Sequence, residues 1–223
     1  MAHVLRMIQS FKSSKSMRKS FLSLLAVLFL AAPLSAQYFG LRAGVNATDA
    51  SIDFDNAEIE TDGESNLMLG IFLDIPLGTD IISIQPELNY LNRGYSIDAS
   101  LGSIASFERT VSFVDLGALV KLNFGRPEGI GFYVGAGPSF SYAVSGTVTD
   151  LNGERDVDFD ADRINRSGLE FTAVGGLTID IGLKLFVEGR YNGSFTDQSD
   201  LDDSEIRQRY IGINGGVLVP LGN

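Results

Sequence analysis

Eight stretches of the sequence alternate apolar and polar residues with a period of two, which is the pattern of a β-strand with two unlike faces. Most of them have the length of about 9 to 11 residues that a tilted strand needs to cross a bilayer. An even number of such strands is what a closed antiparallel barrel in an outer membrane requires. The stretches are residues 38–46, 67–75, 82–92, 112–124, 130–142, 168–179, 183–192 and 210–221.

The connections between these stretches are of two kinds that alternate along the chain. Short turn-rich pieces (PLGTD, GRPEG and DIG) follow the second, fourth and sixth stretches, whereas long polar segments follow the others. The long segments are acidic, and residues 48–66 contain seven Asp and Glu without one basic residue. We therefore predict an all-β chain: an eight-stranded antiparallel up-and-down transmembrane β-barrel with short periplasmic turns and long acidic extracellular loops.

The alternation also predicts which side chains meet lipid and which fill the interior of the barrel. In residues 130–142 one face carries Phe132, Val134 and Ala136, whereas the other carries glycine, serine and Tyr133. The first kind of face suits lipid, and the second suits the lumen, where charges of both signs form buried ion networks. The predicted lumen charges are Arg42, Asp74, Glu87, Asp115, Lys121, Glu170, Glu188 and Arg190.

The first 36 residues have the order of a secretory signal peptide. A basic segment precedes the apolar run of residues 21–32, which is shorter than the roughly 18 to 20 residues of a spanning helix. We expect cleavage after Ala36 and a barrel domain over residues 37–223, with Met17 as a possible true start. The alternative is that this segment remains as a membrane anchor.

Composition excludes several classes of function. Of the 17 Lys and Arg residues five lie before residue 37, whereas all 28 Asp and Glu follow it, so the predicted mature chain is strongly acidic. Such a chain is a poor partner for nucleic acid, which needs a clustered positive surface. No cysteine is present, which excludes a lipoprotein anchor, disulfides and thiolate chemistry.

Six motifs spread over residues 40–194 carry a resemblance to a known family. They are GLRAGVN, GIFLDIPL, IQPELNYLNRG, VDLGALVKLNF, YVGAGPSFSY and VEGRYNGS, in that order. In these motifs the chain resembles the small outer-membrane β-barrel family typified by PorT-like and "porin family" proteins of Bacteroidota-type bacteria. The resemblance implies a barrel in the outer membrane of a Gram-negative cell, and it offers a PorT-like role in protein secretion as one alternative.

Neither catalysis nor a cofactor is expected. The lipid A acylases and deacylases among eight-stranded barrels use Ser and His, but the only histidine, His3, lies in the predicted signal peptide. A weak metal candidate is the segment DVDFDADR, whose oxygen ligands would suit calcium. Because these acids would share one face of a protruding strand, solvation is the simpler interpretation. The four candidates are Asp156, Asp158, Asp160 and Asp162.

Side chains just fill the interior of an eight-stranded barrel, the size of OmpA and OmpX, which disfavours an open pore. The glycine-rich lumen face nevertheless leaves a narrow or gated path as an alternative. The leading hypothesis is a structural or surface-interaction barrel. Its expected partners are outer-membrane lipid and lipopolysaccharide, the barrel-assembly machinery during insertion, and an unknown protein partner.

Overall fold

The computed structural model describes residues 37–54, 57–60, 62–63, 65–97, 107–125, 129–150, 153–159, 161, 165–196 and 204–222. The predicted signal peptide lies outside this range. Regular secondary structure in the described part of the chain is entirely β-strand. None of the described residues forms a helix with the length and hydrophobicity to span a membrane.

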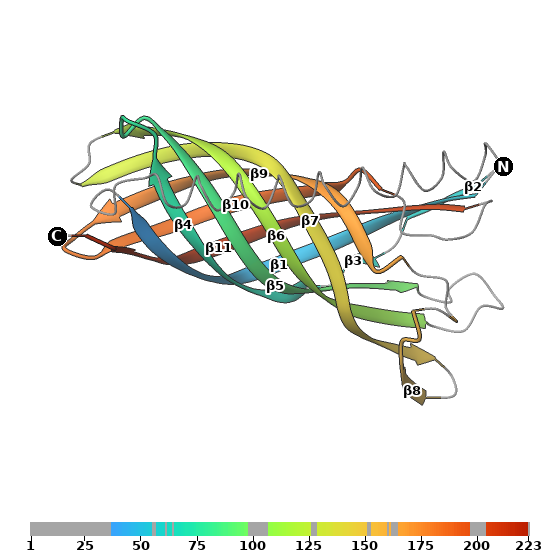
Figure 1. Ribbon diagram of the computed structural model, residues 1–223. Helices are drawn as coiled ribbons and strands as arrows, with labels where there is room; N and C mark the ends of the chain where they lie inside the picture. The colour runs from blue at the N-terminus through green and yellow to red at the C-terminus, as the bar shows by residue number, and fades with distance from the viewer. Residues whose placement is uncertain are drawn as a thin grey trace, which may run out of the picture.

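Eight long strands form one closed antiparallel barrel (Figure 1). Each strand pairs with the next along the chain, and β11 pairs with β1 from Tyr38 opposite Pro220 to Phe54 opposite Ser204. This closure confirms the predicted fold. The strands are β1 (Tyr38–Phe54), β4 (Ser65–Pro76), β5 (Ile82–Ile97), β6 (Phe107–Gly125), β7 (Ile130–Asp150), β9 (Ser167–Asp180), β10 (Lys184–Ser194) and β11 (Ser204–Pro220).

The two ends of the barrel differ. We call the end that contains Tyr38 and Pro220 the turn end, because short connections there join β4 to β5, β6 to β7 and β9 to β10. Gly78 and Gly182 in these turns have φ angles of 72° and 92°, in the left-handed region that favours glycine. The opposite end is the loop end. Parts of the predicted acidic loops lie outside the described residues, namely 55–56, 61, 64, 98–106, 151–152, 160, 162–164 and 197–203.

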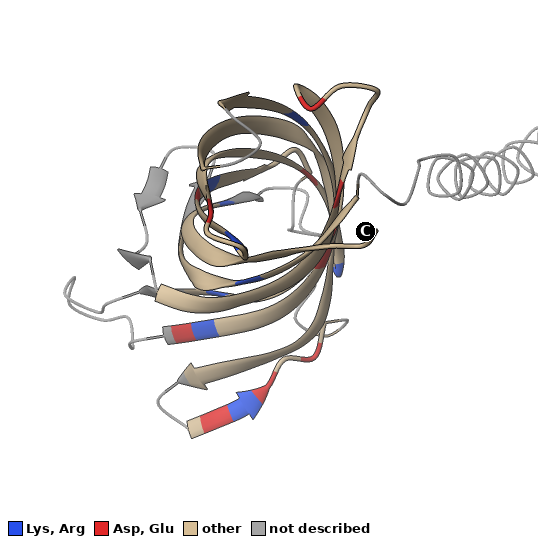
Figure 2. Ribbon diagram, turned by 90° about the vertical axis from the view of Figure 1, so that its left-hand side faces the viewer, with Lys and Arg blue, Asp and Glu red and all other residues tan. Residues whose placement is uncertain are grey.

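Three short strands extend the sheet at the loop end: β2 (Ala57–Glu60) pairs with β1, β3 (Asp62–Gly63) with β5, and β8 (Gly153–Asp156) with β7. Figure 1 shows them on the side away from the C-terminus. On β8 acidic and basic residues lie next to each other (Figure 2).

Several strands run further toward the loop end than their alternation predicts. The predicted strand 130–142 continues to Asp150, for example. A register shift lies just beyond Tyr142: Phe113 pairs with Ala143, Ser112 pairs with Ser145, and Val144 has no partner in the ladder. Val144 and Ser145 are therefore both exposed, and the alternation changes phase. Backbone pairing continues where the period of two is interrupted.

The two faces of the barrel wall have the predicted polarity. Apolar side chains such as Val134, Val187 and Ile213 point outward and are 50%, 59% and 64% exposed in the protein alone, as expected for a surface that meets lipid. Many charged and amide side chains, such as those of Arg42, Glu87 and Asn89, point inward and are buried. Figure 2 shows Lys, Arg, Asp and Glu positions along the wall of the barrel.

Candidate functional site

The inside of the barrel is a stack of side-chain layers, which we describe from the turn end to the loop end. At the turn end a cavity of about 130 Å³ is lined by residues that include Tyr38, Asp74, Lys121 and Lys184. Lys121 Nζ lies 2.7 Å from Asp74 Oδ2 and 4.2 Å from the centre of the Tyr133 ring. Both residues of this ion pair line the cavity.

A lower apolar layer follows the cavity. Phe72 packs edge-on against Phe186, with ring centres 5.5 Å apart, and Leu218 completes this group. A second group at this level is Leu119, Tyr133 and Val174. Because both groups are buried, they separate the open cavity from the charges above them.

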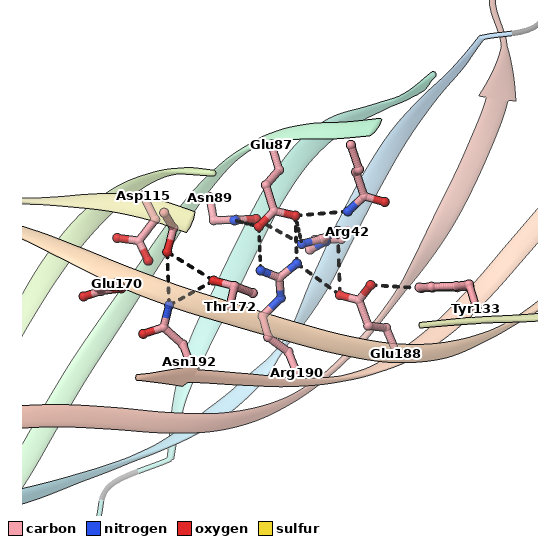
Figure 3. A network of polar contacts seen from close by, with 12 residues as sticks. Arg42, Glu87, Asn89, Asp115, Tyr133, Glu170, Thr172, Glu188, Arg190 and Asn192 are labelled. Atoms are coloured by element: carbon pink, nitrogen blue, oxygen red, sulfur yellow. Dashed lines mark hydrogen bonds and ion pairs between the residues drawn. The ribbon is translucent and has the colours of Figure 1, made fainter. Parts of the chain in front are cut away.

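The middle of the lumen holds four charged side chains, Arg42, Glu87, Glu188 and Arg190, which we call the ion tetrad (Figure 3). Arg190 donates from Nη1 and Nη2 to the two oxygens of Glu87 at 2.6 and 2.8 Å. Arg42 Nη1 donates to Glu87 Oε2 at 3.0 Å, and its Nη2 lies 3.7 Å from Glu188 Oε1. Two positive and two negative charges are therefore matched, with side chains no more than 1% exposed.

Neutral donors complete the ion tetrad. Gln85 Nε2 and Asn89 Nδ2 donate to Glu87 at 3.0 and 3.2 Å, and Tyr133 Oη donates to Glu188 Oε2 at 2.9 Å. Glu87 thus accepts five hydrogen bonds. A buried carboxylate needs this saturation, because its desolvation costs several kcal/mol unless charge and hydrogen bonds compensate it.

Above the ion tetrad lie Arg93, Asp115 and Glu170, which we call the upper triad. Arg93 Nη2 donates to Asp115 Oδ2 at 2.7 Å and to Glu170 Oε2 at 2.9 Å, and its Nη1 donates to Glu170 Oε1. Ser141 Oγ donates to Glu170 Oε1 at 2.9 Å. All three members of the triad are buried.

An apolar cap closes the lumen toward the loop end. Its members are buried, and two of them, Val157 and Phe159, come from the segment after β8 rather than from the barrel wall. Val157 N donates to Gly146 O at 2.8 Å, and the guanidinium of Arg166 lies 4.4 Å from the centre of the Phe159 ring. The cap consists of Met68, Leu91, Val111, Phe113, Ala143, Val148, Val157, Phe159 and Tyr210.

The lumen glycines do not leave a water path at the positions where neighbouring side chains fill the space. A Cβ atom on Gly40 would overlap the ring of Phe72, and one on Gly176 would overlap Tyr133. At Gly70 the same atom would overlap the amide oxygen of Asn89. The interpretation of the glycine-rich face as room for water is wrong at these positions, because the small residues admit large partners from adjacent strands.

The structure places all eight predicted lumen charges on the inward face. Four of them form the ion tetrad, Asp115 and Glu170 belong to the upper triad, and Lys121 pairs with Asp74. Sequence reasoning missed Arg93, because the predicted strand ended one residue earlier. The alternation of Glu87, Asn89 and Leu91 would have placed Arg93 inward if the strand had been extended by one residue.

The candidate metal segment has a different role in the described part of the chain. Asp156 and Asp158 are exposed, and Asp158 Oδ1 accepts a hydrogen bond from Ala161 N at 3.1 Å. Asp160 and Asp162 lie outside the described residues. Among the residues that are described, no group of three His, Cys, Asp or Glu is placed to hold a metal ion. The alternation here serves Val157 and Phe159, which point into the apolar cap.

Comparison with known protein families supports the assignment of the fold as a membrane β-barrel. The sequence model of a family described as "Outer membrane protein beta-barrel domain" matches residues 35–200. The chain belongs to this family. Membership in this family implies that the protein resides in the outer membrane.

Several solved structures of outer-membrane proteins are similar to this barrel. Ail of Yersinia pestis is 11% identical, with 82% of this chain and 98% of that chain covered and a TM-score of 0.42. Neisserial surface protein A is 12% identical, with coverages of 79% and 96% and a TM-score of 0.43. OprG from Pseudomonas aeruginosa is 14% identical, with coverages of 82% and 96% and a TM-score of 0.42. No curated protein matches the chain in sequence.

Proposed function

We propose that this protein is a sealed barrel with a structural or surface-interaction role in the outer membrane. The observation that carries the proposal is the ion pair between Glu87 on β5 and Arg190 on β10 (Figure 3). In the ring of eight long strands, β5 and β10 are separated by three strands in either direction. The pair therefore spans the lumen, and it has apolar layers on both sides.

The proposed sealing follows from electrostatics as well as from packing. A solute that passes the ion tetrad has to separate charges that are desolvated and hydrogen-bonded, and breaking a buried pair costs about 3 to 5 kcal/mol. The apolar cap adds a second barrier, since an ion that enters it loses its hydration without finding a partner. A sealed barrel can still act through its rim and its outer face.

The proposed interaction surface is the loop end, which we assign to the cell exterior. There β7 continues through the register shift and pairs with β8, whose four residues are all exposed. The expected partners are lipid and lipopolysaccharide at the outer face, the barrel-assembly machinery during insertion, and a protein at the loop end. Export through a cleaved signal peptide in a Gram-negative cell is part of the same proposal.

Catalysis is not part of the proposal. Residues 37–223 contain neither His nor Cys, and the lumen carboxylates Glu87 and Glu188 are engaged by arginines rather than facing open space. Two alternatives are kept as outcomes of experiments: a narrow or gated pore, and a PorT-like role in protein secretion. The second rests on the sequence resemblance alone.

Conductance across a planar lipid bilayer tests the sealing directly. The refolded wild-type barrel is expected to show no steady current above that of the bare membrane. Glu87→Ala, which removes the carboxylate shared by Arg42 and Arg190, is expected to raise the current, whereas the lipid-facing control Leu88→Ala is not. A steady, ion-selective conductance of the wild-type barrel would contradict the proposal and favour the pore.

A further inference from the structure

Charge is balanced in two of the three charged layers of the lumen, but not in the third. Lys121 balances Asp74, and the ion tetrad contains two arginines and two glutamates. The upper triad sets two carboxylates, Asp115 and Glu170, against the single guanidinium of Arg93. Fully ionised, this layer has one negative charge without a matching cation.

The two carboxylates of the upper triad are not equally stabilised. Glu170 accepts two hydrogen bonds from Arg93 and one from Ser141. Asp115 accepts one from Arg93 at Oδ2, while its Oδ1 is buried and has no hydrogen-bond partner. The residue as a whole is 2% exposed. Asp115 is therefore the carboxylate for which the negative charge is more costly.

The two carboxylates also repel each other at short range. Asp115 Oδ2 and Glu170 Oε2 accept hydrogen bonds from the same nitrogen, Arg93 Nη2, at 2.7 and 2.9 Å. Their separation cannot exceed the sum of these two distances. Water has little access to screen the repulsion, because Phe113 and Tyr210 of the apolar cap lie against the Arg93 guanidinium at 4.5 and 5.1 Å. Two like charges so close in a dry site do not both ionise readily.

We propose that the upper triad is a binding site for one proton, which Asp115 holds on its unpartnered Oδ1. Protonation makes the layer neutral and leaves the Oδ2 hydrogen bond to Arg93 in place. A proton also suits this site better than a metal ion does, since no group of three acidic ligands is gathered in the described part of the lumen. The inference concerns protonation and does not depend on whether the barrel conducts.

The charged and titratable groups around Asp115 determine the electrostatic potential at its carboxyl group. The titratable and charged groups that face it come from β5, β9, β10 and β11, while β7 contributes the neutral Ser141 opposite it. Arg93, which donates to Asp115 Oδ2 at 2.7 Å, favours the charged form of Asp115, whereas the negative charge of Glu170 disfavours it. The facing groups are Arg93, Glu170, Arg190 and Tyr210.

A folded barrel that holds a proton which the unfolded chain has lost becomes less stable as pH rises. By linkage, each pH unit in that range raises the unfolding equilibrium constant by up to about tenfold. Urea unfolding of the barrel in lipid vesicles, between about pH 5.5 and about pH 8.5, measures this dependence. Asp115→Asn mimics the protonated acid, so it is expected to remove this part of the dependence and to exceed wild type in stability at high pH. Asp80→Asn, in an exposed turn, is the matched control and is expected to keep the wild-type dependence.

Infrared spectroscopy of the wild-type barrel at neutral pH provides a second measurement that needs no variant to fold. The carbonyl stretch of a protonated carboxylic acid is expected, and Asp115→Asn is expected to abolish it. Absence of that band in wild type, or its loss in Glu170→Gln but not in Asp115→Asn, would overturn the assignment. So would a stability at high pH that changes when sodium is replaced by a bulky organic cation at constant ionic strength, because the occupant would then be a metal ion.

Discussion

Arg190 on β10 and Glu87 on β5 form a two-point hydrogen-bonded ion pair across the barrel, although 103 residues separate them in the sequence. Both side chains are 1% exposed. Glu87 also accepts a hydrogen bond from Arg42 on β1, so one carboxylate connects three strands of the ring. Backbone hydrogen bonds join only neighbouring strands of the closed sheet. The ion pair between Glu87 and Arg190 joins strands on opposite sides of the lumen.

Removal of the Glu87 charge is expected to destabilise the barrel strongly. Glu87→Gln leaves Arg42 and Arg190 with Glu188 as the one remaining tetrad carboxylate, and an uncompensated buried charge costs about 3 to 5 kcal/mol. Urea unfolding in lipid vesicles measures the loss. Adding Arg190→Met to the same chain removes the surplus charge and is expected to recover part of the stability. Equal unfolding midpoints for wild type and Glu87→Gln would mean that the tetrad is unimportant for stability.

Two glycines provide a matched test of the close packing in the wall. A Cβ on Gly216 would overlap the backbone carbonyl of Leu41, whereas a Cβ on the outward-facing Gly175 meets no atom within 4 Å. We expect Gly216→Ala to lower the free energy of unfolding by about 1 to 3 kcal/mol through overpacking. Gly175→Ala is expected to stay within about 0.5 kcal/mol of wild type. Similar losses for both variants in chemical unfolding would refute the difference.

The outward face is expected to reject charge because it meets lipid. Val134 is 50% exposed in the protein alone. If that surface faces the bilayer midplane, Val134→Arg costs about 2 to 4 kcal/mol, as measured by unfolding in vesicles. Val134→Leu retains the apolar character and serves as the control. A tolerated arginine together with a destabilising leucine would show that Val134 faces water or a packed core.

The segment after β8 is expected to depend on Phe159 for its order. Phe159 is 4% exposed and packs in the apolar cap and against Arg166. Phe159→Ala is expected to cost about 3 kcal/mol of stability because the buried ring is lost. If this loss falls on local opening of the segment, the population of the opened segment rises by about two orders of magnitude. Limited proteolysis should then cut residues 153–161 faster than in Glu154→Ala, whose side chain is exposed. Equal cleavage rates would exclude an anchoring role for Phe159.

Membrane orientation can be tested with single cysteines, because the chain has none of its own. Glu154 on β8 at the loop end and Asp80 in a turn at the opposite end are both exposed. On intact cells a membrane-impermeant maleimide is expected to label Glu154→Cys. Labelling of Asp80→Cys should require a permeabilised outer membrane. The reverse pattern would place the loop end in the periplasm.

The wall of the barrel could be predicted because its signal is local. In a strand, successive side chains alternate between the two faces whatever the strand pairs with, so Val134 and Glu87 could be assigned to opposite faces from their neighbours alone. The number of strands and the alternation of short and long connections then required an up-and-down closed sheet. The local nature of this signal also explains why the predicted strand ends were wrong. Beyond Tyr142 one extra residue in β7 interrupts the alternation of inward and outward side chains, so that the period of two no longer indicates a strand.

The contents of the lumen were decided by the tertiary structure. Glu87 and Arg190 each belong to an obvious inward face, but the tilt and stagger of the closed sheet determine that they meet across the ring. The same closure brings Arg93 to two carboxylates and sets Phe72 over Gly40, so that glycine positions become packing sites. Val157 and Phe159 alternate with aspartates in a segment that looked solvated, yet they enter the apolar cap because the chain folds back beside β7. Alternation along a strand fixes the side on which a residue lies, whereas its partner on that side depends on strands far away in the sequence.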